Sequence, residues 1–154
     1  MTTTVKHPDR LAEQINNILS NPESWDQETW HSACGTKHCI AGHGQIASGR
    51  PMDNVTCRDD AKRWYGLTDG DAEWLFYGDR TLPEMHGFAS AALADKPYFN
   101  TYGYDRSGCD RYGYDRNGHN RDRNGYNRDG YNRRGYDRNG DSLPLLKIAA
   151  GDMQ

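Results

Sequence analysis

Branched aliphatic and phenylalanine side chains are scarce in this sequence. Leu, Ile, Val and Phe make up only 19 of the 154 residues, and a share below roughly 20% is typical of disordered chains when the net charge is high. The formal net charge is only −3, so that second condition is not met. The near-neutral balance also disfavours a strongly basic nucleic-acid binder. We infer that the composition averages two unlike segments.

Long apolar runs and abundant cysteine are also missing. No stretch of about 18 apolar residues occurs, which argues against a membrane-spanning helix. Residues 1–6 lack the apolar core of a secretory signal peptide. The four cysteines are too few for a disulfide scaffold in a chain of this size. These absences predict a cytoplasmic or virion-associated protein whose thiols are free or bind metal.

Composition changes near residue 98 and again near residue 141. Residues 1–98 hold all four tryptophans, with 9 basic and 14 acidic residues. Residues 99–141 consist almost wholly of Tyr, Asp, Asn, Arg and Gly, with 9 arginines and 7 aspartates. Residues 142–154 contain a short apolar stretch. We therefore predict three segments with these boundaries: a helical domain, a repeat and a docking helix.

Residues 1–98 carry the signals of short helices. Apolar residues recur with helical spacing after Pro8, and Thr56, Thr68 and Thr81 each precede a further helical pattern as candidate N-caps. No alternating strand pattern of useful length occurs, so we predict a small all-α domain of five or six helices. Residues 142–154 predict one more short helix. It needs a docking surface on this domain or on another chain, because it is too short to be stable alone.

Residues 99–141 form a turn-rich pentapeptide repeat of eight copies, one of which carries two extra residues. Position one is mostly aromatic, position two is always Asp or Asn, and position five is always Gly. Position three is Arg in seven copies. An Asp or Asn side chain accepts hydrogen bonds from backbone N–H groups two residues on, and Gly allows a positive φ. Each copy therefore predicts a turn.

The aromatic and arginine positions of the repeat are candidate interaction residues. Tyrosine and arginine attract each other by about 0.5–1 kcal/mol per exposed contact, and weak units on one chain add through effective concentration. The candidates at position one are Phe99, Tyr104, Tyr114, Tyr126, Tyr131 and Tyr136, and those at position three are Arg106, Arg111, Arg116, Arg128, Arg133 and Arg138. The alternative interpretation is a solvated, disordered tail, because the repeat has almost no aliphatic residues to bury.

Nucleic acid and calcium fit the repeat less well. Arginine with interleaved tyrosine suits single-stranded nucleic acid, but the aspartates nearly cancel the charge and so limit counterion release. Asp, Asn and Gly dominate calcium-binding loops. The repeat, however, has Arg where the next ligand would lie and contains no Glu.

The densest group of reactive side chains lies between residues 31 and 43. Its candidate zinc ligands are His31, Cys34, His38, Cys39 and His43, and Cys57 and His86 are further candidates from elsewhere in the chain. The spacing does not match the paired cysteines of zinc fingers, and buried structural cysteines explain the same residues. A Cys34–Cys39 disulfide and a cysteine nucleophile with a histidine base are the remaining alternatives.

The same region carries a family resemblance. The segment Cys34-Gly-Thr-Lys-His-Cys39-Ile-Ala-Gly42, followed by Tyr65-Gly-Leu-Thr68, resembles a group of small uncharacterised helical proteins of actinobacteria, cyanobacteria and their phages. Their pattern is similar to Cys-Gly-Thr-x-x-Cys-x-Ala-Gly-Trp. The resemblance covers residues 10–95 and brings no activity. His43 stands where that pattern has Trp, which argues against His43 as an obligatory metal ligand.

Together these features predict a non-catalytic structural or interaction protein. The helical domain holds the repeat in place, and the repeat associates with itself or with a larger assembly such as a filament or a virion. The first alternative is a zinc-binding regulatory domain that uses the 31–43 cluster. The second is an accessory protein for single-stranded nucleic acid. No catalytic residue and no membrane partner is predicted.

Overall fold

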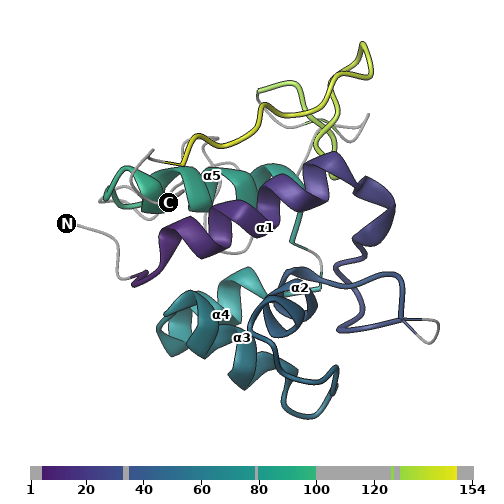
Figure 1. Ribbon diagram of the computed structural model, residues 1–154. Helices are drawn as coiled ribbons and strands as arrows, with labels where there is room; N and C mark the ends of the chain where they lie inside the picture. The colour runs from purple at the N-terminus through teal and green to yellow at the C-terminus, as the bar shows by residue number, and fades with distance from the viewer. Residues whose placement is uncertain (1–4, 33–34, 79, 100–125, 127–128, 149–154) are drawn as a thin grey trace. The chain divides into compact units, whose positions relative to one another are not determined.

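The computed structural model describes residues 5–32, 35–78, 80–99, 126 and 129–148. Within these residues the chain is all-α, as predicted, and has no strand longer than an isolated bridge (Figure 1). Its five α-helices are α1 (Pro8–Ser20), α2 (Ile40–Ala47), α3 (Cys57–Tyr65), α4 (Asp69–Leu75) and α5 (Leu82–Leu93), and a 3-10 helix, η1 (Pro22–Ser24), follows α1. None of the described helices is long and apolar enough to cross a membrane.

The chain divides into two compact units. The first comprises residues 4–80 and 145–154 and contains α1 to α4; we call it the α1–α4 unit. The second comprises residues 81–144 and 1–3 and contains α5; we call it the α5 unit. The segment boundaries near residues 98 and 141 follow composition rather than this grouping, and they stay predictions.

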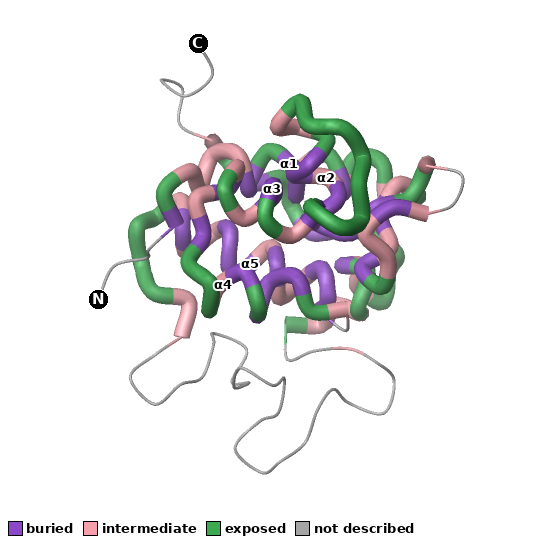
Figure 2. The backbone as a smooth tube through the Cα atoms, turned by 90° about the horizontal axis from the view of Figure 1, so that it is seen from below, coloured by how far each residue is buried: buried purple, intermediate pink, exposed green. Residues whose placement is uncertain are grey.

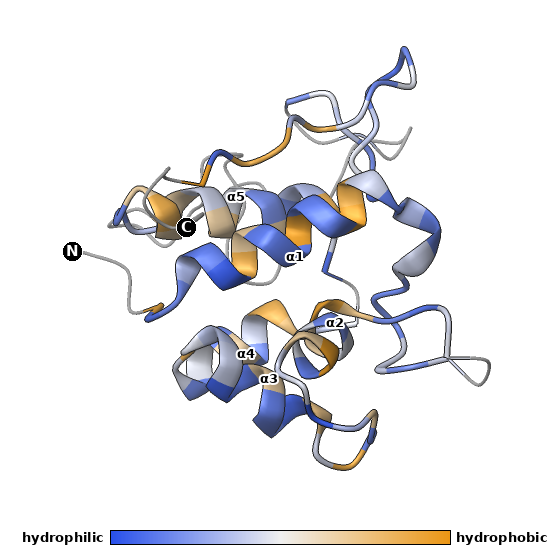
Figure 3. Ribbon diagram, viewed as in Figure 1, coloured by the Kyte–Doolittle hydropathy of each residue, from blue (hydrophilic) through white to orange (hydrophobic). Residues whose placement is uncertain are grey.

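In the α1–α4 unit, α2 packs against α3, and α1 contacts both. The helix α1 begins at Pro8, whose fixed φ suits a first helical position. It buries Leu11, Ile15 and Ile18 completely, while polar side chains occupy its other side, as the blue and orange bands of α1 in Figure 3 illustrate. This spacing of about 3.6 residues is what the sequence pattern predicts.

The helix α2 is rich in glycine because its neighbours approach it closely. A β-carbon on Gly42 would collide with the Trp30 carbonyl group, and one on Gly44 would lie 2.7 Å from the Tyr65 ring. The Tyr65 side chain is fully buried, and its hydroxyl donates to the Ile40 carbonyl oxygen at 2.8 Å. Figure 2 shows the buried stretches of α2 and α3 in purple. The contact of α2 with α3 therefore depends on the missing side chain at Gly44, and the contact of α2 with the Trp30 backbone depends on the missing side chain at Gly42.

The ends of α3 and α4 follow the predicted signals with one exception. Gly66 ends α3 in the left-handed region, with φ +72°. The Thr68 hydroxyl caps α4 by accepting from the Asp71 N–H at 3.1 Å. Thr56 precedes α3 but does not cap it, because its hydroxyl donates to the Asp60 carboxylate instead. The predicted cap at Thr56 is therefore wrong.

In the α5 unit, α5 begins with a reciprocal capping box. The Thr81 side chain accepts from the Glu84 N–H, and the Glu84 carboxylate accepts from the Thr81 N–H. The Leu82 N–H donates to the Arg133 carbonyl oxygen at 2.8 Å, and His86 Nε2 donates to the Pro144 carbonyl oxygen at 2.8 Å. These bonds join the start of α5 to residues far along the sequence.

Residues 132–136 and 137–141 make the same hydrogen bonds. The Oδ1 atom of Asn132 accepts from the N–H groups of Arg134 and Tyr136 at 3.0 and 3.1 Å. The Oδ1 atom of Asp137 accepts from the corresponding N–H groups of residues 139 and 141, both at 2.9 Å. Gly135 and Gly140 both have φ +83°. Because a single Oδ1 atom accepts both hydrogen bonds, either Asn or Asp can close the turn at position two of the repeat.

The helix predicted for residues 142–154 is wrong over residues 142–148, which are not helical; residues 149–154 lie outside the described part. The backbone of this stretch finds partners elsewhere. The Leu143 N–H donates to the Gly135 carbonyl oxygen at 2.9 Å. The Asn16 side chain accepts from the Leu146 N–H at 2.7 Å and donates to the Leu146 carbonyl oxygen at 2.9 Å. Because these backbone groups already have hydrogen-bond partners, the helical hydrogen bonds of a short helix would not add stability here.

We predict that Gly44→Ala destabilises the protein although alanine favours helices. The new methyl group meets the buried Tyr65 ring, and overpacking of this kind costs about 1–3 kcal/mol. Gly70→Ala on α4 is the control, because no atom lies within 4 Å of its β-carbon position. It should leave stability unchanged or raise it by up to about 1 kcal/mol. Urea unfolding of the two variants measures the difference, and equal midpoints would contradict the packing argument.

Candidate functional site

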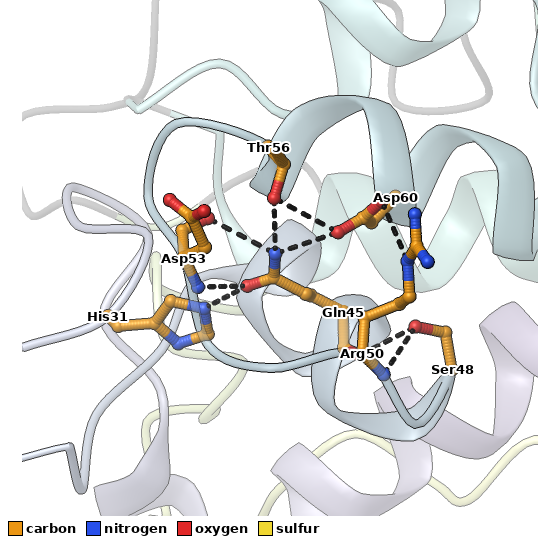
Figure 4. A network of polar contacts seen from close by, with 7 residues as sticks. All are labelled: His31, Gln45, Ser48, Arg50, Asp53, Thr56 and Asp60. Carbon is orange, nitrogen blue, oxygen red and sulfur yellow. Dashed lines mark hydrogen bonds and ion pairs between the residues drawn. The ribbon is translucent and has the colours of Figure 1, made fainter.

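A buried amide, Gln45 on α2, connects three parts of the α1–α4 unit (Figure 4). Its Oε1 atom accepts from the Asp53 N–H at 3.0 Å. Its Nε2 atom donates to the Asp53 carbonyl oxygen, to Thr56 Oγ1 and to Asp60 Oδ2, at 3.1, 3.2 and 2.9 Å. The side chain thus joins α2 to the loop of residues 48–56 and to the first turn of α3.

The orientation of Gln45 determines the tautomers of two buried histidines. His31 Nε2 lies 2.6 Å from Gln45 Oε1, and because that oxygen is an acceptor, Nε2 must carry the hydrogen. In neutral His31 the Nδ1 atom is then an acceptor. His38 Nδ1 lies 2.8 Å from it and must donate. The backbone N–H of Asp53 therefore sets, through Gln45, the tautomers of both rings.

His43 extends the row of imidazole rings. The rings of His31 and His38 meet edge to face with centroids 4.9 Å apart, and those of His38 and His43 do so at 5.4 Å. His43 Nε2 lies 3.2 Å from the Ser24 carbonyl oxygen and donates to it. Burial, and then the neighbouring His38, lower the pKa of His43 to about 4. Burial also lowers the pKa of His38, as does His31.

Asp60 is the buried acid of the network. The hydrogen bond from Gln45 is the largest reason why its pKa lies below the ordinary value, and bonds from Thr56 and Arg50 act in the same direction. The Arg50 guanidinium forms an ion pair with Asp60 at 3.4 Å. A charged carboxylate is therefore stable in this position, because its oxygens are occupied by donors.

Both described cysteines are free, buried thiols. The Sγ atom of Cys39, the N-cap residue of α2, accepts from the Gly42 N–H at 3.4 Å. Burial raises the pKa of Cys39 to about 11 and that of Cys57 to about 12. Cys57 Sγ lies 3.9 Å from His31 Nε2, but that nitrogen already carries a hydrogen directed at Gln45. This geometry does not activate the Cys57 thiol as a nucleophile.

The structure brings three of the predicted zinc ligands together, namely His31, His38 and His43, while Cys39 caps the adjoining helix and Cys34 lies outside the described residues. Within the described part of the chain, no group of three or more His, Cys, Asp or Glu side chains is arranged to hold a metal ion. Both ring nitrogens of His31 have partners, so His31 binds a metal only by giving up one of them. Zinc binding therefore stays a prediction.

Among the candidate interaction residues of the repeat, the structure brings Tyr126 and Arg138 together. The Arg138 guanidinium lies 4.5 Å from the centroid of the Tyr126 ring. Arg133 is exposed, whereas Tyr131 and Tyr136 are half-buried. The ring of Phe99 meets that of Tyr98, with centroids 4.9 Å apart. The other candidates lie outside the described residues: Tyr104, Tyr114, Arg106, Arg111, Arg116 and Arg128.

The sequence prediction missed the centre of the network. Gln45, Asp60 and Thr56 carry most of its hydrogen bonds, and none of them was a candidate site residue. One feature of the sequence indicates the role of Gln45. It is the only amide in a helix otherwise made of apolar and small residues and one histidine. Such a residue must find buried partners.

Comparisons of this chain with protein-family models, with curated proteins and with solved structures found no match. The resemblance to the actinobacterial, cyanobacterial and phage proteins therefore stays a prediction, and the function has to be argued from the contacts themselves.

We predict that Gln45→Leu lowers stability by about 2–4 kcal/mol. Leucine is similar in size, but it leaves the His31 Nε2–H, the Asp53 N–H and the Asp60 carboxylate each short of a buried partner. Urea unfolding gives the change in free energy when the slope with denaturant stays constant. A loss below about 1 kcal/mol would show that water replaces the amide.

We also predict that stability falls as the pH drops from about 6.5 to about 4. Burial in the folded protein lowers the pKa of His43 from its ordinary 6.5 to about 4, so the unfolded chain binds the proton first. The contribution of neutral His43 to the free energy of unfolding is therefore fully present above pH 6.5 and is lost as the pH falls to about 4. At lower pH the free energy of unfolding falls further, because Asp60 becomes protonated. The contribution of His43 to this loss is on the order of 3 kcal/mol.

The control is His43→Gln, whose amide is able to donate to the Ser24 carbonyl oxygen without titrating. It should flatten the pH dependence of the unfolding free energy between pH 4 and 6.5. An unchanged slope in this variant would assign the effect to other groups.

Proposed function

We propose that this chain is a non-catalytic interaction protein whose Tyr/Arg repeat associates with further copies of the chain, or attaches it to a larger assembly such as a filament or a virion. The observation that carries the proposal is the stacking of the Arg138 guanidinium on the Tyr126 ring at 4.5 Å. Arg138 is position three of the eighth copy, and Tyr126 is position one of the sixth. Two copies of the motif thus meet through the pair of residue types that recurs along the repeat.

The local turns support this role because Asx and Gly, which are not the candidate interaction residues, give them their shape. The turns at Asn132 and Asp137 use only the position-two side chain and backbone groups. Arg133 and Arg138 are exposed. A unit whose shape is maintained by Asx and Gly can present its Tyr and Arg to other molecules, and several units on one chain raise the effective concentration.

The helical part offers no activated side chain to support catalysis among its described residues. Burial raises the pKa values of Cys39 and Cys57 far above neutrality. The nitrogens of His31 are occupied by Gln45 and His38. These groups suit a rigid scaffold that displays a repeat.

Substitution of the position-one tyrosines tests the proposal. We expect full-length protein to associate with rising concentration in light scattering. The Tyr→Ser variant at positions 104, 114, 126, 131 and 136 should weaken association by about tenfold or more, since each stacked pair contributes about 0.5–1 kcal/mol. The matched control is Tyr→Phe at the same five positions, which keeps the rings and should associate like the wild type.

Two results would sink the proposal. One is a wild-type chain that stays monomeric at every concentration. The other is a Tyr→Ser variant that associates as strongly as the wild type. Steep loss of binding to single-stranded nucleic acid with added salt would instead favour the nucleic-acid alternative.

A further inference from the structure

The loop between α2 and α3 displays two apolar side chains to solvent. Val55 is 90% exposed and Met52 is 54% exposed. Single exposed apolar residues are common on protein surfaces, but these two lie in one short loop on either side of the exposed Asp53. An apolar pair around an acid is complementary to a group that is both apolar and basic.

This loop is held in place from beneath. Gln45 binds both the N–H and the carbonyl group of Asp53, at 3.0 and 3.1 Å (Figure 4). The Asp53 Oδ1 atom accepts from the Val55 N–H at 2.9 Å. At the start of the loop, Arg50 pairs with the buried Asp60. A surface fixed in this way loses little conformational entropy when it binds.

Asp53 differs from the acids around it. Asp60 has Arg50 as its partner, and Asp59 lies 3.6 Å from Arg58. Asp53 makes no ion pair with any residue that the structure describes. Residues 1–98 carry 14 acidic against 9 basic residues, whereas residues 99–141 carry 9 arginines against 7 aspartates. Among the described residues the Asp53 carboxylate thus has no cation paired with it, and residues 99–141 carry cationic side chains in excess.

We propose that Met52, Asp53 and Val55 form a docking surface for the Tyr-(Asp/Asn)-Arg units of a second copy of this chain. The tyrosine ring packs on Met52 and Val55, since thioether and aromatic groups attract each other. The arginine guanidinium pairs with the Asp53 carboxylate. Five of the eight copies have the sequence Tyr-(Asp/Asn)-Arg, and they begin at Tyr104, Tyr114, Tyr126, Tyr131 and Tyr136. Each chain therefore has one docking surface and five units that the docking surface of a neighbouring chain can bind. This inference rests on the proposed function.

Light scattering of the full-length chain over a concentration series tests the docking surface. Asp53→Asn removes the charge but keeps an Oδ1 acceptor for the Val55 N–H, so the loop geometry is retained. Val55→Ser removes the apolar group. We expect each variant to raise the concentration needed for association by about twofold to fivefold.

The controls are Glu73→Gln, an exposed acid on α4, and Leu145→Ser, a side chain 59% exposed; both should associate like the wild type. Circular dichroism and thermal melting verify that every variant folds.

The outcomes separate this inference from the proposed function. Weaker association of Asp53→Asn and Val55→Ser, with unchanged controls, supports the docking surface.

If the Tyr→Ser variant loses association while both loop variants keep it, the repeat binds without the loop, and the docking surface is wrong although the proposed function stands. If the loop variants lose association but the Tyr→Ser variant keeps it, the repeat is not the occupant. Stronger association of Asp53→Asn would mean that the loop holds the repeat of its own chain, which also overturns the inference. A chain that never associates overturns both proposals.

Discussion

The arrangement of the α1–α4 unit depends on one fully buried amide. Removing the Gln45 side chain from water is favourable only because its oxygen and nitrogen both meet several partners. Those partners come from α3, from the loop between the helices and from His31. A hydrophobic side chain in the same place would fill the space equally well, but it would specify neither the loop conformation nor the histidine tautomers. The polar network therefore provides specificity where the surrounding apolar contacts provide stability.

Two structural features let a chain with few aliphatic residues adopt an ordered structure: close packing at glycines and turns that are closed by side chains. In the helical part, Gly42 allows the Trp30 carbonyl group to approach α2, and Gly44 allows the buried Tyr65 ring to do so, so that this ring fills part of the core. In the described end of the repeat, the side chains of Asn132 and Asp137 close the two turns by accepting from backbone N–H groups within the same turn. The first of these turns also bonds to Leu82 and Leu143, which ties it to the α5 unit.

The sequence predicted the elements whose signals are local. Pro8 and the apolar spacing after it indicated α1, and the Thr68 and Thr81 hydroxyls cap α4 and α5 as expected. The predictions failed where a group far along the sequence competes with the local hydrogen-bond partner. The Thr56 hydroxyl turns to Asp60, which the network holds nearby. Residues 142–148 form no helix, because Asn16 and Gly135 satisfy backbone groups at Leu146 and Leu143. For the candidate site, the sequence grouped His31, His38 and His43 as candidate ligands, whereas the tautomers of His31 and His38 are set by Gln45.

The sequence by itself thus determined the all-α class of the helical part, the positions of most helix ends and the turns at Asn132 and Asp137 in the described repeat units, since propensity, capping and turn formation act over a few residues. Only the tertiary structure decided which polar groups share a buried site, which thiols are shielded, and which side chains of the 48–56 loop face solvent. Those outcomes depend on contacts between residues far apart in the chain, where burial and hydrogen-bond satisfaction outweigh local preference.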